Sequence, residues 1–157
     1  MPYKRTKAAT EGECDAFLMV DNLTFDGKAL AKKGNGGAIS TANNVVTITN
    51  CDFMGYQASR GGAIFVAWGK LNVDYCTFSN CSTGDNTAGV DKVGGGGIWT
   101  TAQHLTVTNT DFDNCSCILG NSQGGGIFHN IRDNNLAIYN GGDNNEYAAF
   151  PVNKSKE

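Results

Sequence analysis

The sequence predicts an all-β protein, a short right-handed parallel β-helix (a solenoid) of about five coils with terminal caps. Three observations lead to this fold class. Glycine occurs 21 times among 157 residues, which disfavours helices and favours turns. The unit Gly-Gly-(Ala/Gly)-Ile recurs four times, ending at Ile39, Ile64, Ile98 and Ile127. Apolar and polar residues alternate after these units, as in Val46-Thr47-Ile48, and this is the period of a strand.

The segment after each isoleucine is regular. In the first three units a phenylalanine follows the isoleucine by 14 residues. Between them, apolar residues lie seven and nine residues after the isoleucine. An earlier copy lacks the glycines but keeps Leu18, Val20 and Phe25, and Leu136 with Ile138 form a displaced final copy. The predicted ladders are Ile39/Ile64/Ile98/Ile127, Leu18/Val46/Leu71/Leu105, Val20/Ile48/Val73/Val107 and Phe25/Phe53/Phe78/Phe112. One repeat cannot bury its apolar face alone, so stacked strands about 4.8 Å apart are the coherent solution.

The segment from each phenylalanine to the next unit varies in length, which places inserted loops on one side of the stack. We expect the paired glycines where the chain turns sharply or where two backbones approach closely. We expect asparagines such as Asn43, Asn44, Asn50 and Asn109 at corners, because this residue tolerates turn conformations.

The chain divides into three parts. Residues 1–16 are expected to form an N-terminal cap or tail, residues 17–142 the β-helix repeat domain, and residues 143–157 a C-terminal cap or tail. The two caps are expected because the open ends of a solenoid expose unpaired strand edges.

The repeat resembles that of chlamydial polymorphic outer-membrane proteins and related bacterial surface β-helix proteins. In that family Gly-Gly-Ala-Ile is paired with Phe-x-x-Asn, and here the second half reads NCDFMGY from Asn50, YCTFSNC from Tyr75 and NTDFDNC from Asn109. The chain departs from the pattern at the final asparagine, where Lys28, Tyr56, Cys81 and Cys115 stand. The resemblance implies an adhesin-like role and an extracellular or cell-surface location.

Charge and hydropathy exclude several functions. The net charge is −3, so no electrostatic footprint for nucleic acid is expected, and no apolar run reaches the length of a membrane span. Residues 1–13 contain no apolar stretch typical of a signal peptide, which leaves either an intracellular chain or an excised domain.

Four of the six cysteines fall on repeat positions. Cys51 and Cys76 lie two residues before a ladder phenylalanine and are expected to act as small core residues. Cys81 and Cys115 lie three residues after one, and adjacent coils would bring each pair within disulfide reach. The sequence is compatible both with disulfides and with stacked free thiols at these positions.

An exposed aromatic stripe is the candidate binding site. Phe65, Trp99 and Phe128 directly follow ladder isoleucines, so alternation points them outward, and Trp68 lies nearby in the sequence. A flat aromatic column suits a sugar or a partner protein, although it suits packing beneath loops as well.

We therefore expect a non-enzymatic module that acts as a structural stalk or binds a host or neighbouring-cell surface protein or glycan. No complete catalytic constellation, metal site or cofactor motif is found. One alternative is a carbohydrate-active β-helix enzyme, for which Asp52 and Asp111 lie at equivalent positions two coils apart. The other is a structural subunit that associates end to end with copies of itself.

Overall fold

The computed structural model of the chain describes residues 16–28, 34–42, 44–84, 94–117, 124–130, 136–141 and 147–150. Within these ranges all regular secondary structure is β, and the strands pair in parallel throughout. The predicted all-β class and the parallel pairing of the strands are therefore confirmed.

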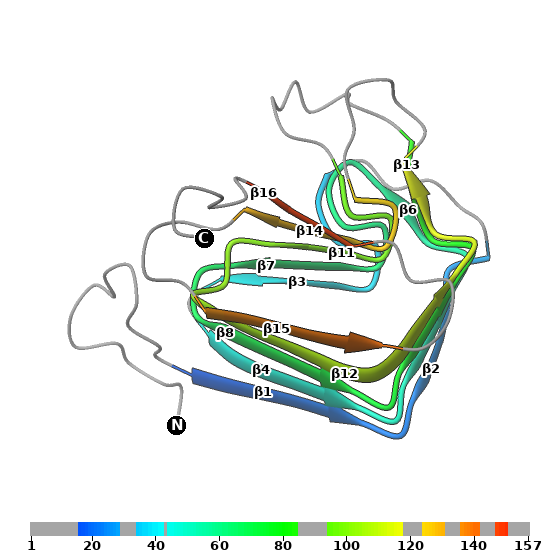
Figure 1. Cartoon of the computed structure of the whole chain (residues 1–157). Coiled ribbons are helices and arrows are strands. Elements are labelled where there is room, and N and C mark those ends of the chain that lie inside the picture. Colours follow the sequence, from blue (N-terminus) through cyan, green and yellow to red (C-terminus); the bar gives the residue numbers. More distant parts are fainter. Residues whose placement is uncertain are drawn as a thin grey trace.

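The largest sheet has two arms that share one long strand, and Figure 1 shows the bend between them. The long arm contains, in order, β1 (Ala16–Asp21), β4 (Asn44–Thr49), β8 (Lys70–Asp74), β12 (His104–Asp113) and β15 (Leu136–Gly141). The short arm contains β2 (Thr24–Asp26), β5 (Asp52–Met54), β9 (Thr77–Ser79) and the last residues of β12.

Two smaller sheets complete the described structure. The five-stranded sheet contains β3 (Ile39–Ala42), β7 (Ile64–Ala67), β11 (Ile98–Thr100), β14 (Ile127–Asn130) and β16 (Tyr147–Phe150). The three-stranded sheet contains β6 (Gln57–Ala58), β10 (Ser82–Thr83) and β13 (Ser116–Cys117). In Figure 1 the five-stranded sheet lies across from the long arm, and the short arm rises along one side.

The register of the pairs is the one that the sequence predicts. The four predicted ladders align residue by residue: isoleucines pair in the five-stranded sheet, the two aliphatic ladders in the long arm, and phenylalanines in the short arm. The rings of Phe25, Phe53, Phe78 and Phe112 stack with centroid spacings of 4.8, 4.8 and 4.7 Å. These spacings equal the distance between neighbouring strands, so each ring rests on the equivalent ring of the next repeat.

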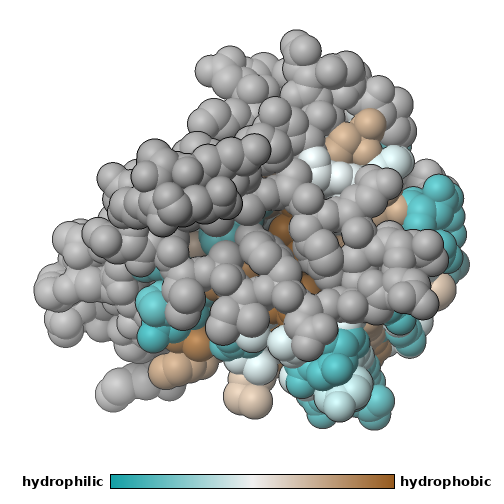
Figure 2. Space-filling view, viewed as in Figure 1, coloured by the Kyte–Doolittle hydropathy of each residue, from teal (hydrophilic) through white to brown (hydrophobic). Residues whose placement is uncertain are grey.

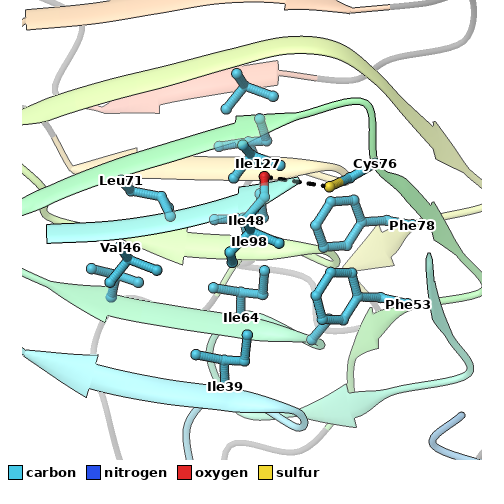
Figure 3. Close-up of a cluster of buried hydrophobic side chains, with 14 of the residues drawn as sticks. Ile39, Val46, Ile48, Phe53, Ile64, Leu71, Cys76, Phe78, Ile98 and Ile127 are labelled. Carbon is cyan, nitrogen blue, oxygen red and sulfur yellow. Dashed lines mark hydrogen bonds between the residues drawn. The ribbon is translucent and has the colours of Figure 1, made fainter. Parts of the chain in front are cut away.

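The ladder side chains meet in one hydrophobic core. Figure 3 shows isoleucines of the five-stranded sheet facing aliphatic residues of the long arm, with Phe53 and Phe78 closing one end. Ile64, Leu71 and Phe78 have no exposed surface. Strands rich in β-branched and aromatic residues form here because each can bury its inner face only against the others.

The paired glycines have two different roles, as expected. Gly61 has a φ of +60°, a conformation in which a side chain would run into the backbone of Ile64. Gly62 has no such φ, but a Cβ there would meet the carbonyl oxygen of Gly96, in the equivalent turn before β11 (Ile98–Thr100). The first glycine therefore permits the turn, and the second permits close approach of two backbones.

Corners of the chain are made by residues with positive φ. Asn50 and Asn109 have φ values of 51° and 45°, which confirms their predicted place at turns. Asn44 instead begins β4, and Asn43 lies outside the described residues.

The terminal segments are described in part. Residues 1–15 of the predicted N-terminal cap lie outside the described residues, and Ala16 begins β1. In the predicted C-terminal cap, Tyr147–Phe150 form β16, which pairs with β14. The displaced final copy does form a strand of the long arm, but Leu105 pairs with Ala137 rather than with Leu136.

Candidate functional site

The predicted aromatic stripe forms a stacked column, but it is not exposed. The ring centroids of Phe65 and Trp99 are 4.8 Å apart, and those of Trp99 and Phe128 are 5.9 Å apart. Trp99 and Phe128 keep only 5% and 2% of their surface exposed, and Phe65 is half-buried. The prediction of a solvent-facing stripe is therefore wrong for two of its three rings.

The physical reason is that both faces of β11 are covered. Ile98, Trp99 and Thr100 are all buried, although neighbouring side chains of a strand leave on opposite faces. The guanidinium carbon of Arg60 lies 5.0 Å from the centre of the Trp99 ring, within the range of a cation–π contact. Trp99 therefore belongs to the packed structure, and its buried indole Nε1 has no hydrogen-bond partner.

The fourth predicted residue, Trp68, lies at the turn between β7 and β8. Its φ is 61°, that of the following Gly69 is 75°, and its backbone N–H donates to Thr101 Oγ1 at 3.0 Å. The half-buried Trp68 is thus part of a turn, whereas the other three residues form the column on neighbouring strands.

The two carboxylates considered for catalysis lie where the repeat places them. Asp52 pairs with Thr77 and Thr77 with Asp111, so the aspartates are two strands apart on the outer face of the short arm. Both are exposed.

The bend between the two arms carries a regular polar surface, which we call the corner ladder. It consists of two parallel columns: Asp21, Thr49, Asp74 and Thr108 in the first, and Asn22, Asn50, Tyr75 and Asn109 in the second. Aspartate and threonine alternate along the first column. Every residue of the second has a positive φ between 45° and 56°.

Hydrogen bonds order the corner ladder. Thr49 Oγ1 and Asn50 Nδ2 donate to Asp21 Oδ1 at 2.5 and 3.1 Å. Two strands further on, the same arrangement recurs on Asp74 Oδ1, where Thr108 Oγ1 and Asn109 Nδ2 both donate at 2.8 Å. The two aspartates are therefore held in equivalent orientations by equivalent donors.

These hydrogen bonds favour the charged carboxylates. Those from Thr49 and then Asn50 lower the pKa of Asp21, and those from Asn109 and then Thr108 lower the pKa of Asp74. Both carboxylates therefore keep their charge to a lower pH than an ordinary aspartate does, each with fixed donors on one oxygen.

Tyr75 interrupts the asparagine column and is 64% exposed. Its backbone N–H donates to Thr108 O at 3.3 Å, which fixes the corner while leaving the ring in solvent. At the lower right of Figure 2, where Figure 1 places this bend, the described surface is largely hydrophilic. Tyr75 thus gives a polar surface one exposed aromatic ring.

Sequence reasoning missed this surface, although a signal for it exists. Thr49, Asp74 and Thr108 each lie ten residues after a ladder isoleucine, so aligning the repeats would have revealed the column.

Comparison of the chain with protein-family models, with curated proteins and with solved structures finds no match. In the described part of the chain no three His, Cys, Asp or Glu side chains group as a metal site. The described residues also contain no helix long and apolar enough to cross a membrane.

Proposed function

We propose that the chain is a short right-handed parallel β-helix and serves as a non-enzymatic recognition module of a cell-surface or secreted protein. The β-helix is supported by parallel pairing in which each strand lies beside its equivalent in the next repeat. A right-handed winding is the usual result when parallel strands are joined by crossover connections. The surface location rests on the resemblance of the Gly-Gly-Ala-Ile repeat to that of bacterial surface proteins.

The corner ladder is the recognition surface in this proposal. The observation that carries it is the repeated hydrogen bonding of Asp21 and Asp74, which fixes alternating acceptors and donors beside the exposed ring of Tyr75. Ordered polar groups need not lose conformational freedom on binding, so they suit a ligand with many hydroxyl groups. An aromatic face adds apolar contact with the C–H face of a sugar. The ligand class is therefore a glycan.

A glycan array followed by calorimetry tests this assignment. Tyr75→Ala and Asp74→Asn should each weaken binding at least about tenfold, the effect of losing roughly 1.4 kcal/mol. Asn72→Ala is the matched control, because Asn72 lies in the same strand two residues before Asp74, and it should leave affinity unchanged. Binding by Tyr75→Ala equal to that of the unaltered protein would remove the corner ladder as the site.

The non-enzymatic part of the proposal has its own test. The unaltered protein should not cleave pectin, alginate or similar polysaccharides. Turnover of any of these that is lost in Asp111→Ala would replace the recognition module with an enzyme.

End-to-end association is a second candidate, favoured by the edge at β1. Leu18 and Val20 are half-buried, whereas Val46 and Ile48 in the next strand have no exposed surface. If this edge joins two molecules, sedimentation velocity should show oligomers that Val20→Glu abolishes. A single monomeric species at high protein concentration would contradict it.

A further inference from the structure

Four thiols occupy two corners of the structure. Cys51 and Cys76 lie where the long arm meets the short arm, and Cys81 and Cys115 lie between the short arm and the three-stranded sheet. Cys51, Cys76, Cys81 and Cys115 each follow a residue whose φ lies between 50° and 53°. Each Sγ lies near the carbonyl oxygen two residues earlier, at 3.0, 3.3, 3.5 and 3.8 Å respectively. Each also lies near a carbonyl oxygen of the preceding repeat, at 3.7, 3.6, 3.6 and 3.4 Å, as Figure 3 shows for Cys76.

These shared contacts fix the distance between neighbouring thiols. Cys81 and Cys115 directly precede Ser82 and Ser116, which pair in register, so the two cysteines lie side by side on parallel strands. Because both side chains make the same two contacts, they point the same way. Their sulfur atoms are therefore separated by about the strand spacing, ~4.8 Å.

This spacing does not favour a disulfide. The bond needs sulfur atoms about 2.05 Å apart and Cβ atoms usually within about 4.5 Å, whereas parallel side chains on paired strands keep both distances near the strand spacing. The described cysteines are accordingly free thiols. The neighbouring Cys115 thiol lowers the pKa of Cys81, whereas the Cys81 thiol and burial raise the pKa of Cys115, so Cys81 carries the thiolate more readily.

We propose that Cys81 and Cys115 form a two-coordinate site for a soft monovalent cation, of which Cu(I) is the type. Two collinear metal–thiolate bonds, each taken as about the 2.3 Å of a zinc–thiolate bond, span about 4.6 Å, which is close to the sulfur spacing. Soft thiolate ligands select Cu(I), whereas a structural zinc ion needs four ligands. Binding replaces both thiol protons: one M⁺ and two RSH give one RS–M–SR⁻ and two H⁺.

The partial exposure of Cys115 and a nearby charge favour this pair. Cys81 has no exposed surface, but its half-buried neighbour Cys115 gives an ion a path from solvent, whereas Cys51 and Cys76 are 0% and 2% exposed. The nearby Asp113 carboxylate is one of the charges that raise the pKa of Cys115, and the same negative charge attracts a cation. The site lies apart from the corner ladder, so it does not depend on the proposed glycan recognition.

The test is an anaerobic titration of the reduced full chain with Cu(I) supplied by the chromophoric chelator bicinchoninate. The expected result is one tightly held ion, with Cys81→Ser and Cys115→Ser each weakening it at least about 100-fold, more than the loss of an outer partner of a ligand usually costs. Cys117→Ser and Cys51→Ser are the matched controls and should retain the ion. Serine keeps a donor for the corner carbonyls, and circular dichroism confirms the fold of each variant.

Two results would overturn the proposal. One is equal Cu(I) affinity in Cys81→Ser, Cys115→Ser and the unaltered protein, which would mean that other groups hold the ion. The other is a Cys81–Cys115 disulfide found by mass spectrometry in the air-exposed protein, because it would show that the sulfur atoms are not held apart. X-ray absorption should find two sulfur neighbours, and a larger number would equally contradict a two-coordinate site.

Discussion

Replacing Gly61 with alanine should cost the protein a large part of its stability. The residue has a φ of +60°, and this left-handed conformation costs an L-residue about 1–2 kcal/mol. The new Cβ would also lie 2.7 Å from the carbonyl carbon of Ile64, closer still to its oxygen, and 2.8 Å from the backbone nitrogen of Trp99. Backbone atoms cannot rotate away as a side chain can, so the chain itself must shift, which adds about 1–3 kcal/mol.

Gly34→Ala is the control that separates the two effects. Gly34 also has a positive φ, +102°, but a Cβ there would meet nothing within 4 Å. Urea unfolding followed by circular dichroism should give a loss of about 2–5 kcal/mol for Gly61→Ala, the sum of the two costs, and a smaller loss for Gly34→Ala. Equal losses in the two variants would refute the reasoning, because the contact with Ile64 and Trp99 would then carry no cost.

Three further predictions concern hydrogen bonds and protons. Thr110 donates from Oγ1 to Thr108 O at 2.7 Å, as the cysteines do at equivalent corners, so urea unfolding should show Thr110→Cys near the unaltered stability and Thr110→Val about 1–3 kcal/mol lower. Burial lowers the pKa of His129, so only the unfolded chain binds a proton at this residue as the pH falls below 6.5. The free energy of unfolding should therefore decline over this range, and the decline should be absent in His129→Gln. The lowered pKa of Asp74 stabilises the fold above the unfolded value of 3.8, and this contribution should disappear as the pH falls through the folded value, but not in Asp74→Asn.

The repeat allowed the strand pairing to be predicted, because side-chain period and residue spacing together specify a register. The phenylalanine ladder is the clearest case, since a slip of one residue would turn Phe53 and Phe78 to the outside. The displaced last copy was predicted as part of the repeat, but its register was not, because its apolar residues no longer follow the spacing. There Leu105 pairs with Ala137.

Exposure was harder to predict than pairing. The alternation of apolar and polar residues correctly places Trp99 and Ile98 on opposite faces of their strand. It gives only the face from which a side chain leaves the strand. Whether that face meets solvent depends on residues distant in the sequence, such as Arg60, whose side chain lies over the Trp99 ring. A local pattern therefore identified the column and could not identify its surroundings.

The corners show why such a repeat can hold different chemistry without losing its fold. At the residue after a positive-φ turn, either a thiol or a hydroxyl can donate to the carbonyl two residues earlier, as Cys76 and Thr110 do. Leu23 follows Asn22 at such a turn, so the position also accepts a residue without a donor. The ladder positions between corners must fill the core and tolerate little change. Corner residues are therefore the positions at which sequence can vary, and because each recurs at the strand spacing, variation there places chosen groups about 4.8 Å apart on a rigid support. Both the Asp–Thr column and the Cys81–Cys115 pair arise in this way, which is why chemistry in this molecule is expected at the corners rather than on the flat faces.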